Sequence, residues 1–253
     1  MPDPGRLWEL ADVVDVTPDT VEATTLRLRL PEVPELLPGQ YYLVRLAIAA
    51  RPGAVEQAFS VSSSPYPPSP HIEITVREVP GGRASPHLVH EVRVGDQLHV
   101  RGPYGFLIWT EEDGGPLVLI GAGSGVAPLI SIVRYAVDRG STMPMTLLCS
   151  SRDRPRILFR HAIEELVQRA PWLSVVHTFT RSPEDGYARY HRRIDAPMID
   201  EVARSLLDAS LVDGNLAGML FLVAGSSAMV GATREAIAAL GVSEASVSSE
   251  NHA

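Results

Sequence analysis

Three glycines at alternate positions form the part of the sequence best suited to bind a phosphate group. Gly121, Gly123 and Gly125 follow the apolar run 117–120 and precede the mostly apolar segment 126–138. This order is typical of a buried strand, a tight turn and a helix. Glycine lets the backbone approach a ligand closely, and a helix start offers free N–H groups and a positive dipole end. A phosphate loop and a turn without a ligand are equal alternatives for this stretch alone, and Pro128 departs from the usual dinucleotide fingerprint.

Three further polar or glycine-containing segments follow predicted strands in the same half of the chain. They are Ser150–Arg152 after strand 145–149, Thr180–Arg181 after strand 173–179, and Gly225–Ser227 after strand 219–224. Apolar patterns between the strands predict helices over 126–138, 158–169, 196–207 and 229–240. Strands that alternate with helices form a parallel sheet, and such sheets bind ligands at the carboxyl ends of their strands. The polar strand ends together therefore predict a nucleotide site.

The N-terminal half has the period-two alternation of β-strands instead. We expect strands at 21–30, 41–48, 59–62, 71–79 and 97–101, and a short helix at 85–92 with Ser85 as its N-cap. Proline and glycine turns separate these strands, as in an antiparallel barrel or sandwich. Gly-Pro-Tyr-Gly at 102–105 and the acidic, glycine-rich segment 111–115 mark the change of pattern. We therefore expect a barrel domain in residues 1–106 and an α/β domain in residues 107–253.

Composition narrows the classes of function. The chain has 253 residues, is 45% hydrophobic and carries a net charge of −8, which argues against a nucleic-acid partner. Its single cysteine, Cys149, excludes a disulfide within the chain and a cluster held by several thiolates, and predicts a reducing, cytoplasmic setting. We expect no signal peptide and no membrane-spanning run. His87, His90 and His99 lack metal-ligand spacing, so no metal site is expected.

Five short motifs occur in a fixed order along the chain. They are Pro38-Gly39-Gln40-Tyr41, Gln57-Ala58-Phe59-Ser60, Gly81-Gly82-Arg83-Ala84-Ser85, Gly102-Pro103-Tyr104-Gly105 and the stretch Gly121 to Pro128. In this order they resemble the ferredoxin–NADP⁺ reductase superfamily, over nearly the whole chain. That resemblance implies an antiparallel Greek-key FAD-binding barrel followed by a Rossmann-like, parallel-sheet NAD(P)-binding domain. It also accounts for Pro128, which the family's nucleotide loop contains.

The resemblance assigns catalytic and flavin-binding roles to named residues. Phe59 would lie against the isoalloxazine ring, and Ser60 would place its hydroxyl near flavin N5, which accepts hydride. Glu250 matches a C-terminal acidic residue near the flavin, with a solvated position in the chain's tail as the alternative. The remaining residues assigned to FAD are Gln57, Ala58, Val76, Arg77, Gly82, Arg83, Ala84 and Ser85.

Two departures from the family pattern concern the cofactors. Gln57 stands where the family has a phosphate-binding arginine; an amide can hydrogen-bond a phosphate but adds no charge, and Arg77 or Arg83 could compensate. Ala224 stands where relatives have a cysteine beside the nicotinamide. This second change is expected to affect hydride transfer rather than the fold.

The nicotinamide nucleotide is assigned to the four polar strand ends. The assigned residues are Gly121, Gly123, Ser124, Gly125, Pro128, Ser151, Arg152, Thr180, Arg181, Gly225 and Ser226. Two arginines and two hydroxyls suit a 2′-phosphate, so NADP(H) is favoured over NAD(H). In the alternative, Arg152 belongs to a solvated cluster with Arg154 and Arg156, or Arg181 meets the pyrophosphate.

The resulting functional hypothesis is a reductase that moves hydride from NAD(P)H to FAD and electrons singly to a separate, ferredoxin-like acceptor. The separate acceptor follows from the single cysteine, since this chain cannot hold a cysteine-ligated iron–sulfur centre. One alternative is a reductase of a small acceptor such as free flavin, a quinone or a ferric chelate. Another is a non-catalytic electron-transfer or regulatory subunit whose flavin binding is weakened at Gln57.

Overall fold

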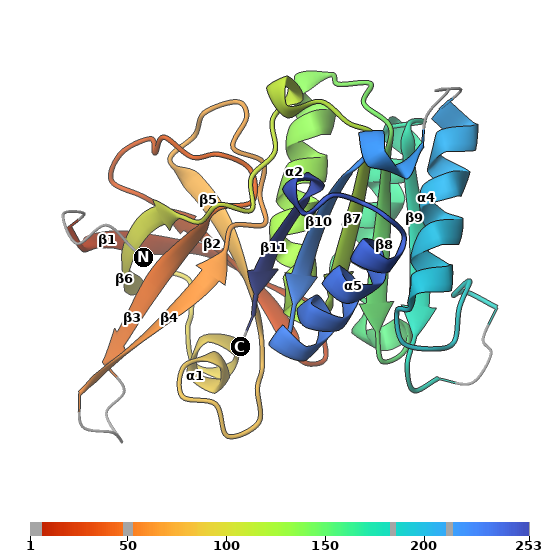
Figure 1. The fold of residues 1–253 in the computed structure, drawn as a ribbon. Coiled ribbons are helices and arrows are strands. Elements are labelled where there is room, and N and C mark those ends of the chain that lie inside the picture. The colour runs from red at the N-terminus through yellow and green to blue at the C-terminus, as the bar shows by residue number, and fades with distance from the viewer. Residues whose placement is uncertain (1–6, 48–52, 183–185, 211–214, 253) are drawn as a thin grey trace.

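A computed structural model describes residues 7–47, 53–182, 186–210 and 215–252 of the chain. Figure 1 shows two domains side by side, with the antiparallel strands in one and the helices around a parallel sheet in the other. Within the described residues, no helix combines the length and the apolar composition that crossing a bilayer requires.

The N-terminal domain is a six-stranded antiparallel sheet with strand order β4-β3-β6-β1-β2-β5. A bridge between Val61 and Ile74 brings the two edges of the sheet together. The elements are β1 Glu9–Thr20, β2 Ala23–Arg29, β3 Tyr41–Ala47, β4 Ala54–Ser60, β5 His71–Arg77, α1 Ser85–His90 and β6 Gln97–Tyr104. This arrangement confirms the predicted antiparallel barrel.

Alternating side chains explain why these segments form strands. Ile72, Ile74 and Val76 of β5 are at most 1% exposed and pack with Leu26 and Leu28 of the neighbouring β2. Removing such side chains from water supplies about 1.5–3 kcal/mol each toward folding. The alternation therefore fixes which face of each strand points into the barrel.

The C-terminal domain is a five-stranded parallel sheet with strand order β11-β10-β7-β8-β9. Its strands are β7 Leu117–Ala122, β8 Met145–Ser151, β9 Leu173–Phe179, β10 Leu220–Gly225 and β11 Val247–Asn251. Its α-helices are α2 Val126–Arg139, α3 Arg160–Arg169, α4 Ala196–Ser210 and α5 Ser227–Ala239. Short 3₁₀ turns are η1 Glu111–Asp113, η2 Gly123–Gly125, η3 Arg154–Arg156, η4 Leu216–Gly218 and η5 Glu244–Ser246.

Helices cover both faces of this sheet. Leu117 and Leu119 of β7 belong to the core shared with α2 and α3, whereas Val118 and Ile120 belong to the core shared with α4 and α5. A strand buried on both faces needs a continuous apolar run, and β7 has one. The predicted Rossmann-like domain is thus confirmed. The division at 106/107 stays a prediction, consistent with the burial of Leu107 in the core with α2.

Local differences from the sequence prediction have local causes. The helix at 85–92 ends at His90 and begins after Ala84, so the prediction of Ser85 as N-cap was wrong. The Ser85 hydroxyl instead accepts a hydrogen bond of 3.0 Å from the backbone N–H of Val79. Strand β4 begins at Ala54, earlier than the predicted 59–62. Ile48, the last residue of one predicted strand, lies outside the described residues.

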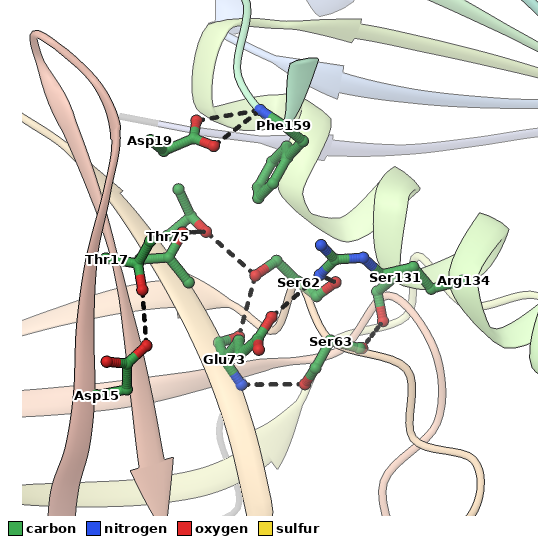
Figure 2. A network of polar contacts seen from close by, with 11 residues as sticks. Asp15, Thr17, Asp19, Ser62, Ser63, Glu73, Thr75, Ser131, Arg134 and Phe159 are labelled. Atoms are coloured by element: carbon green, nitrogen blue, oxygen red, sulfur yellow. Dashed lines mark hydrogen bonds and ion pairs between the residues drawn. The ribbon is translucent and has the colours of Figure 1, made fainter. Parts of the chain in front are cut away.

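Polar contacts join the two domains beside α2. The Ser131 hydroxyl donates to the carbonyl of Ser63 at 2.7 Å, and Arg134 donates to the carbonyl of Ser62 at 2.8 Å. Arg134 also pairs with the Glu73 carboxylate at 3.1 Å (Figure 2). These contacts tie the loop after β4 and strand β5 to the helix that follows the glycine turn.

A second junction involves the C-terminal end of strand β1. Both carboxylate oxygens of Asp19 accept the backbone N–H of Phe159, at 3.1 and 3.0 Å (Figure 2). Phe159 has a left-handed backbone, with φ of 59°, immediately before α3. The C-terminal end of β1 is therefore held against the α/β domain.

Candidate functional site

A cleft of about 290 Å³ lies between the two domains. The barrel contributes Tyr41, Gln57, Ala58, Phe59, Ser60, Thr75, Arg77 and Val79 to its wall. The α/β domain contributes Ser124, Ala127, Glu250, Asn251 and His252. All four residues of the predicted Gln-Ala-Phe-Ser motif thus face the same space as the glycine turn and the C-terminal strand.

The hydroxyl of Ser60 lies in a polar cluster at this cleft. Ser60 is 5% exposed, and its Oγ lies 3.3 Å from Glu250 Oε1 and 3.5 Å from His252 Nε2. His252 Nε2 is in turn 2.9 Å from Glu250 Oε1. The barrel and the C-terminal segment therefore contribute to a single hydrogen-bonded group.

Strand β11 explains how Glu250 reaches this position. It pairs with β10 in parallel, with Glu250 beside Ala224 and Asn251 beside Gly225. The next residue, His252, donates its backbone N–H to the carbonyl of Gly225 at 2.7 Å. Glu250 is consequently held in a sheet with a 19% exposed side chain, which rules out the alternative of a solvated tail.

Tyr41 extends the aromatic wall beside Phe59. It pairs with Ser60 across β3 and β4, and its ring centroid lies 5.9 Å from that of Tyr104. Burial, followed by the nearby Glu250 carboxylate, raises the pKa of Tyr41 above its usual value. The phenol is therefore protonated at neutral pH and can donate a hydrogen bond.

Arg77 provides a test of whether the cleft suits a phosphate. Its Nε is buried and has no hydrogen-bond partner among the described residues. The guanidinium group lies over the glycine turn, 3.6–3.7 Å from where a Cβ atom at Gly123 would stand. An unpaired buried donor is costly unless a ligand satisfies it, so this arrangement fits an anionic group such as a cofactor diphosphate.

Glycine is required in the turn by backbone geometry. Gly123 has a φ of +55°, in the left-handed region. A Cβ atom at Gly125 would stand only 2.1 Å from the carbonyl oxygen of Ala224. The close packing of η2 on β10 therefore accounts for Gly125 without any ligand, whereas Gly123 leaves room beside Arg77.

A second cleft, of about 260 Å³, continues from the first along the carboxyl edge of the parallel sheet. Three residues, Arg77, Ser124 and His252, line both clefts. The other residues of the second cleft are Glu22, Ala122, Gly123, Ser150, Ser151, Arg152, Arg156, Thr180 and Ser226. The four polar strand ends predicted from the sequence thus converge at a single edge.

Several predicted site residues lie outside these two linings. Val76 is buried in the barrel core, and the first cleft ends at Val79, before the Gly82, Arg83, Ala84 and Ser85 segment. Gly121, Pro128 and Gly225 are buried in the α/β domain. Arg181 is exposed, and its backbone N–H donates a hydrogen bond of 2.9 Å to the carbonyl of Arg152.

Sequence reasoning missed Tyr41, Glu22, Arg156 and His252 as lining residues. Tyr41 lies in the motif Pro38-Gly39-Gln40-Tyr41, to which no binding role is assigned, and Arg156 enters the sequence prediction only in the alternative of a solvated cluster. His252 follows a serine-rich segment without apolar alternation. Only the parallel pairing of β11 with β10 reveals that it faces Ser60.

Other reactive side chains have structural roles in the described residues. Burial raises the pKa of the Cys149 thiol to about 12, so it is an inert core residue. His87 and His90 pair with Glu91 and Glu78. No group of three or more potential metal ligands occurs within the described part of the chain.

The two domains match two families of known domains. Residues 8–109 match the oxidoreductase FAD-binding domain, and residues 119–235 match the oxidoreductase NAD-binding domain. The chain belongs to the ferredoxin–NADP⁺ reductase superfamily. It is an NAD(P)H-dependent flavoprotein reductase.

Relatives within the superfamily include reductase components of oxygenase systems. The ferredoxin–NAD(P)⁺ reductase component of the naphthalene 1,2-dioxygenase system from Pseudomonas putida is 29% identical over 243 residues, covering 95% of this chain and 67% of the relative. The ferredoxin reductase component of 3-ketosteroid-9-alpha-monooxygenase from Mycobacterium tuberculosis is 33% identical over 180 residues, covering 67% of this chain and 48% of the relative. The chain thus spans between about half and two thirds of these relatives.

Solved structures of the superfamily share the fold. A ferredoxin NADP⁺ reductase from Neisseria gonorrhoeae with bound FAD and NADP has a TM-score of 0.81 at 20% identity, covering 96% of this chain and 98% of its own. The ferredoxin reductase of carbazole 1,9a-dioxygenase has a TM-score of 0.78 at 25% identity, and the match covers 99% of this chain and 71% of that one. At these identities the likeness concerns the fold.

Proposed function

We propose that this reductase transfers hydride from NAD(P)H to FAD and passes electrons singly to a separate ferredoxin. The observation that carries the proposal is the continuity of the two clefts through Arg77, Ser124 and His252. Bound FAD accepts a hydride and releases electrons one at a time, so the protein needs mainly to hold two cofactors together and exclude water.

Ser60 and Glu250 are the residues that we propose act at the reacting end of the flavin. Glu250 Oε1 lies within hydrogen-bonding distance of both the Ser60 hydroxyl and the His252 imidazole, which fixes the orientation of each. Phe59, 9% exposed, offers an aromatic surface for a ring system. His252 joins this proposal as a positioning residue, since it contacts both proposed catalytic side chains.

In the proposed FAD site, Arg77 supplies the positive charge that Gln57 lacks. Its unpaired Nε and its position over Gly123 support a role in binding a cofactor phosphate. The other proposed FAD residues are those assigned from the family motifs: Gln57, Ala58, Val76, Gly82, Arg83, Ala84 and Ser85.

NADP(H) is the nicotinamide nucleotide that we propose the enzyme prefers. The support is the convergence of Ser151, Arg152 and Thr180 at the second cleft, which offers hydroxyls and a guanidinium group to a 2′-phosphate. Steady-state kcat/KM with NADPH and NADH tests it. A strong preference for NADH would contradict it.

The separate acceptor rests on the single cysteine and on the relatives' names. Cys149 is buried, so this chain has no thiolates for an iron–sulfur centre of its own. The naphthalene and ketosteroid relatives are named as ferredoxin reductase components. A cytoplasmic location, where the Cys149 thiol stays reduced, completes the proposal.

A visible spectrum and stopped-flow reoxidation test the whole proposal. The purified protein should show flavin absorbance and reduce a dye with NAD(P)H, and a [2Fe–2S] ferredoxin should reoxidise it faster than free flavin, a quinone or a ferric chelate does. A colourless protein that binds no added flavin would contradict the flavoprotein function. Faster reoxidation by a small acceptor would contradict the ferredoxin step alone.

A further inference from the structure

A carboxylate from the barrel reaches into the second cleft and contacts the arginines there. Glu22 lies in the two-residue turn between β1 and β2. Its Oε1 accepts a hydrogen bond of 2.8 Å from Arg156 Nε, and its Oε2 lies 3.8 Å from a terminal nitrogen of Arg152. All three residues line the cleft, and the Glu22 side chain is 27% exposed. The flavin-binding domain thus supplies an acidic group to the nucleotide-binding domain.

This contact balances the positive charge at that end of the cleft. Arg156 also pairs with Asp153 at 2.5 Å, so Arg152 and Arg156 face the carboxylates of Glu22 and Asp153. The hydrogen bond from Arg156 is the main reason that the pKa of Glu22 is lowered. Glu22 is therefore ionised at neutral pH, and its carboxylate remains on the guanidinium groups.

The two nicotinamide nucleotides meet this carboxylate differently. A 2′-phosphate carries between one and two negative charges at neutral pH, by analogy with other phosphate monoesters. It must compete with Glu22 for the guanidinium groups and is repelled by the carboxylate. A 2′-hydroxyl has no such conflict, since it can donate a hydrogen bond to an acidic side chain.

We propose that Glu22 sets the selectivity between NADP(H) and NAD(H) by occupying the guanidinium groups of Arg152 and Arg156 that a 2′-phosphate requires. The proposal rests on the proposed function, because it takes the second cleft as the nucleotide site. The effect of Glu22 is on the ratio of the affinities for NADP(H) and NAD(H), whichever of these nucleotides the parent protein prefers. Glu22 is then a specificity-determining residue that reaches the site from the other domain.

Calorimetric titration of the flavin-loaded protein with NADP⁺ and with NAD⁺ tests the proposal without turnover. Glu22→Gln keeps the length of the side chain and removes its charge. We expect it to tighten NADP⁺ binding about tenfold at low ionic strength, and to change NAD⁺ binding by less than about twofold. Glu22→Asp retains the charge, so its NADP⁺/NAD⁺ affinity ratio should be closer to that of the parent protein than the ratio of Glu22→Gln is. Arg156→Gln should weaken the binding of NADP⁺ more than the binding of NAD⁺.

Asp19→Asn is the matched control, because it removes a carboxylate from the end of β1, three residues before Glu22. Asp19 contacts the backbone of Phe159 and neither of the two arginines. It should leave the NADP⁺/NAD⁺ affinity ratio unchanged. An unchanged ratio in Glu22→Gln, or an equal change in Asp19→Asn, would overturn the proposal. Absence of binding of both nucleotides to the parent protein would contradict the proposed function and this inference together.

Discussion

At the scale of single residues, the site depends on a few polar groups held by neighbours from distant parts of the chain. Ser60 and Glu250 are separated by 190 positions and approach to 3.3 Å. Arg77 is the opposite case, since its buried Nε has no partner among the described residues. A satisfied hydroxyl suggests a role in orientation, whereas a buried guanidinium N–H without a hydrogen-bond partner suggests a role in binding.

Ser60→Ala should slow flavin reduction by the nicotinamide nucleotide about 10²-fold, because the change removes the hydroxyl that Glu250 orients. Stopped-flow absorbance under anaerobic conditions measures the rate. Flavin content should stay at the parent level, since the side chain is small and the barrel core is untouched. A normal reduction rate would show that the hydroxyl has no part in the chemistry.

Arg77→Gln should lower flavin affinity by about tenfold or more, because a charge-assisted hydrogen bond to a phosphate is lost. The reverse exchange, Gln57→Arg, should raise affinity by adding such a bond. Fluorescence titration of the flavin-free protein with FAD measures both. Equal affinity in Arg77→Gln and the parent would place the phosphate elsewhere.

At the scale of elements, the predictable strands are those whose side chains alternate or are continuously apolar. β9 was placed at the same residues, 173–179, from its pattern alone. β11, Val-Ser-Ser-Glu-Asn, carries no such signal, because an edge strand with mostly exposed side chains needs no apolar period. β4 likewise has only Val55 and Phe59 as buried apolar residues, which is why its start was missed.

The same reasoning separates the predictable part of the site from the rest. The glycine turn and the polar ends of β8 and β9 follow from local pattern and from the rule for parallel sheets. The approach of Glu22 to Arg156 joins positions 134 apart, and that of His252 to Ser60 joins positions 192 apart. Such contacts depend on how the two domains dock, which no local pattern contains.

The free energy of unfolding should fall in mild acid because of the buried His177 in β9. Burial lowers its pKa to about 4 from 6.5, with a smaller opposing effect of Glu164. The unfolded chain therefore binds more protons than the folded chain between about pH 6.5 and 4, so stability falls as the pH is lowered through this range, by up to about 3 kcal/mol.

Urea unfolding at a series of pH values between 4 and 7.5 measures this effect. The slope of unfolding free energy against pH should be smaller in His177→Gln, which cannot titrate, than in the parent. Carboxylates also titrate in part of this range, and the variant retains them, so the difference between the two slopes isolates the histidine. Identical slopes would contradict the prediction.

At the scale of the whole molecule, polar contacts join the two domains at two places, along α2 and just before the start of α3. Arg134 and Ser131 of α2 bind the loop after β4, and Asp19 near the end of β1 binds the backbone before α3 (Figure 2). The junction holds the two clefts in line, because Ser60 and Arg77 come from one domain and Ser124 and Glu250 from the other.

Arg134→Met should lower the free energy of unfolding by about 1–3 kcal/mol, because it leaves the partly buried Glu73 carboxylate without its cation. Urea denaturation at neutral pH measures the change. Arg169→Met is the control: its pair with Asp138 is an exposed one, so its loss should cost less than about 1 kcal/mol. Equal losses in the two variants would contradict a specific role for the domain junction.

The wall that the two clefts share makes their ligands thermodynamically dependent on each other. Arg77 borders both spaces, so a diphosphate on one side and a nucleotide phosphate on the other draw on the same guanidinium group. Each ligand must then weaken the other by an identical factor, because coupling free energy is reciprocal. A flavin titration performed with and without saturating nucleotide would report that factor, and replacing Arg77 would bring it closer to one.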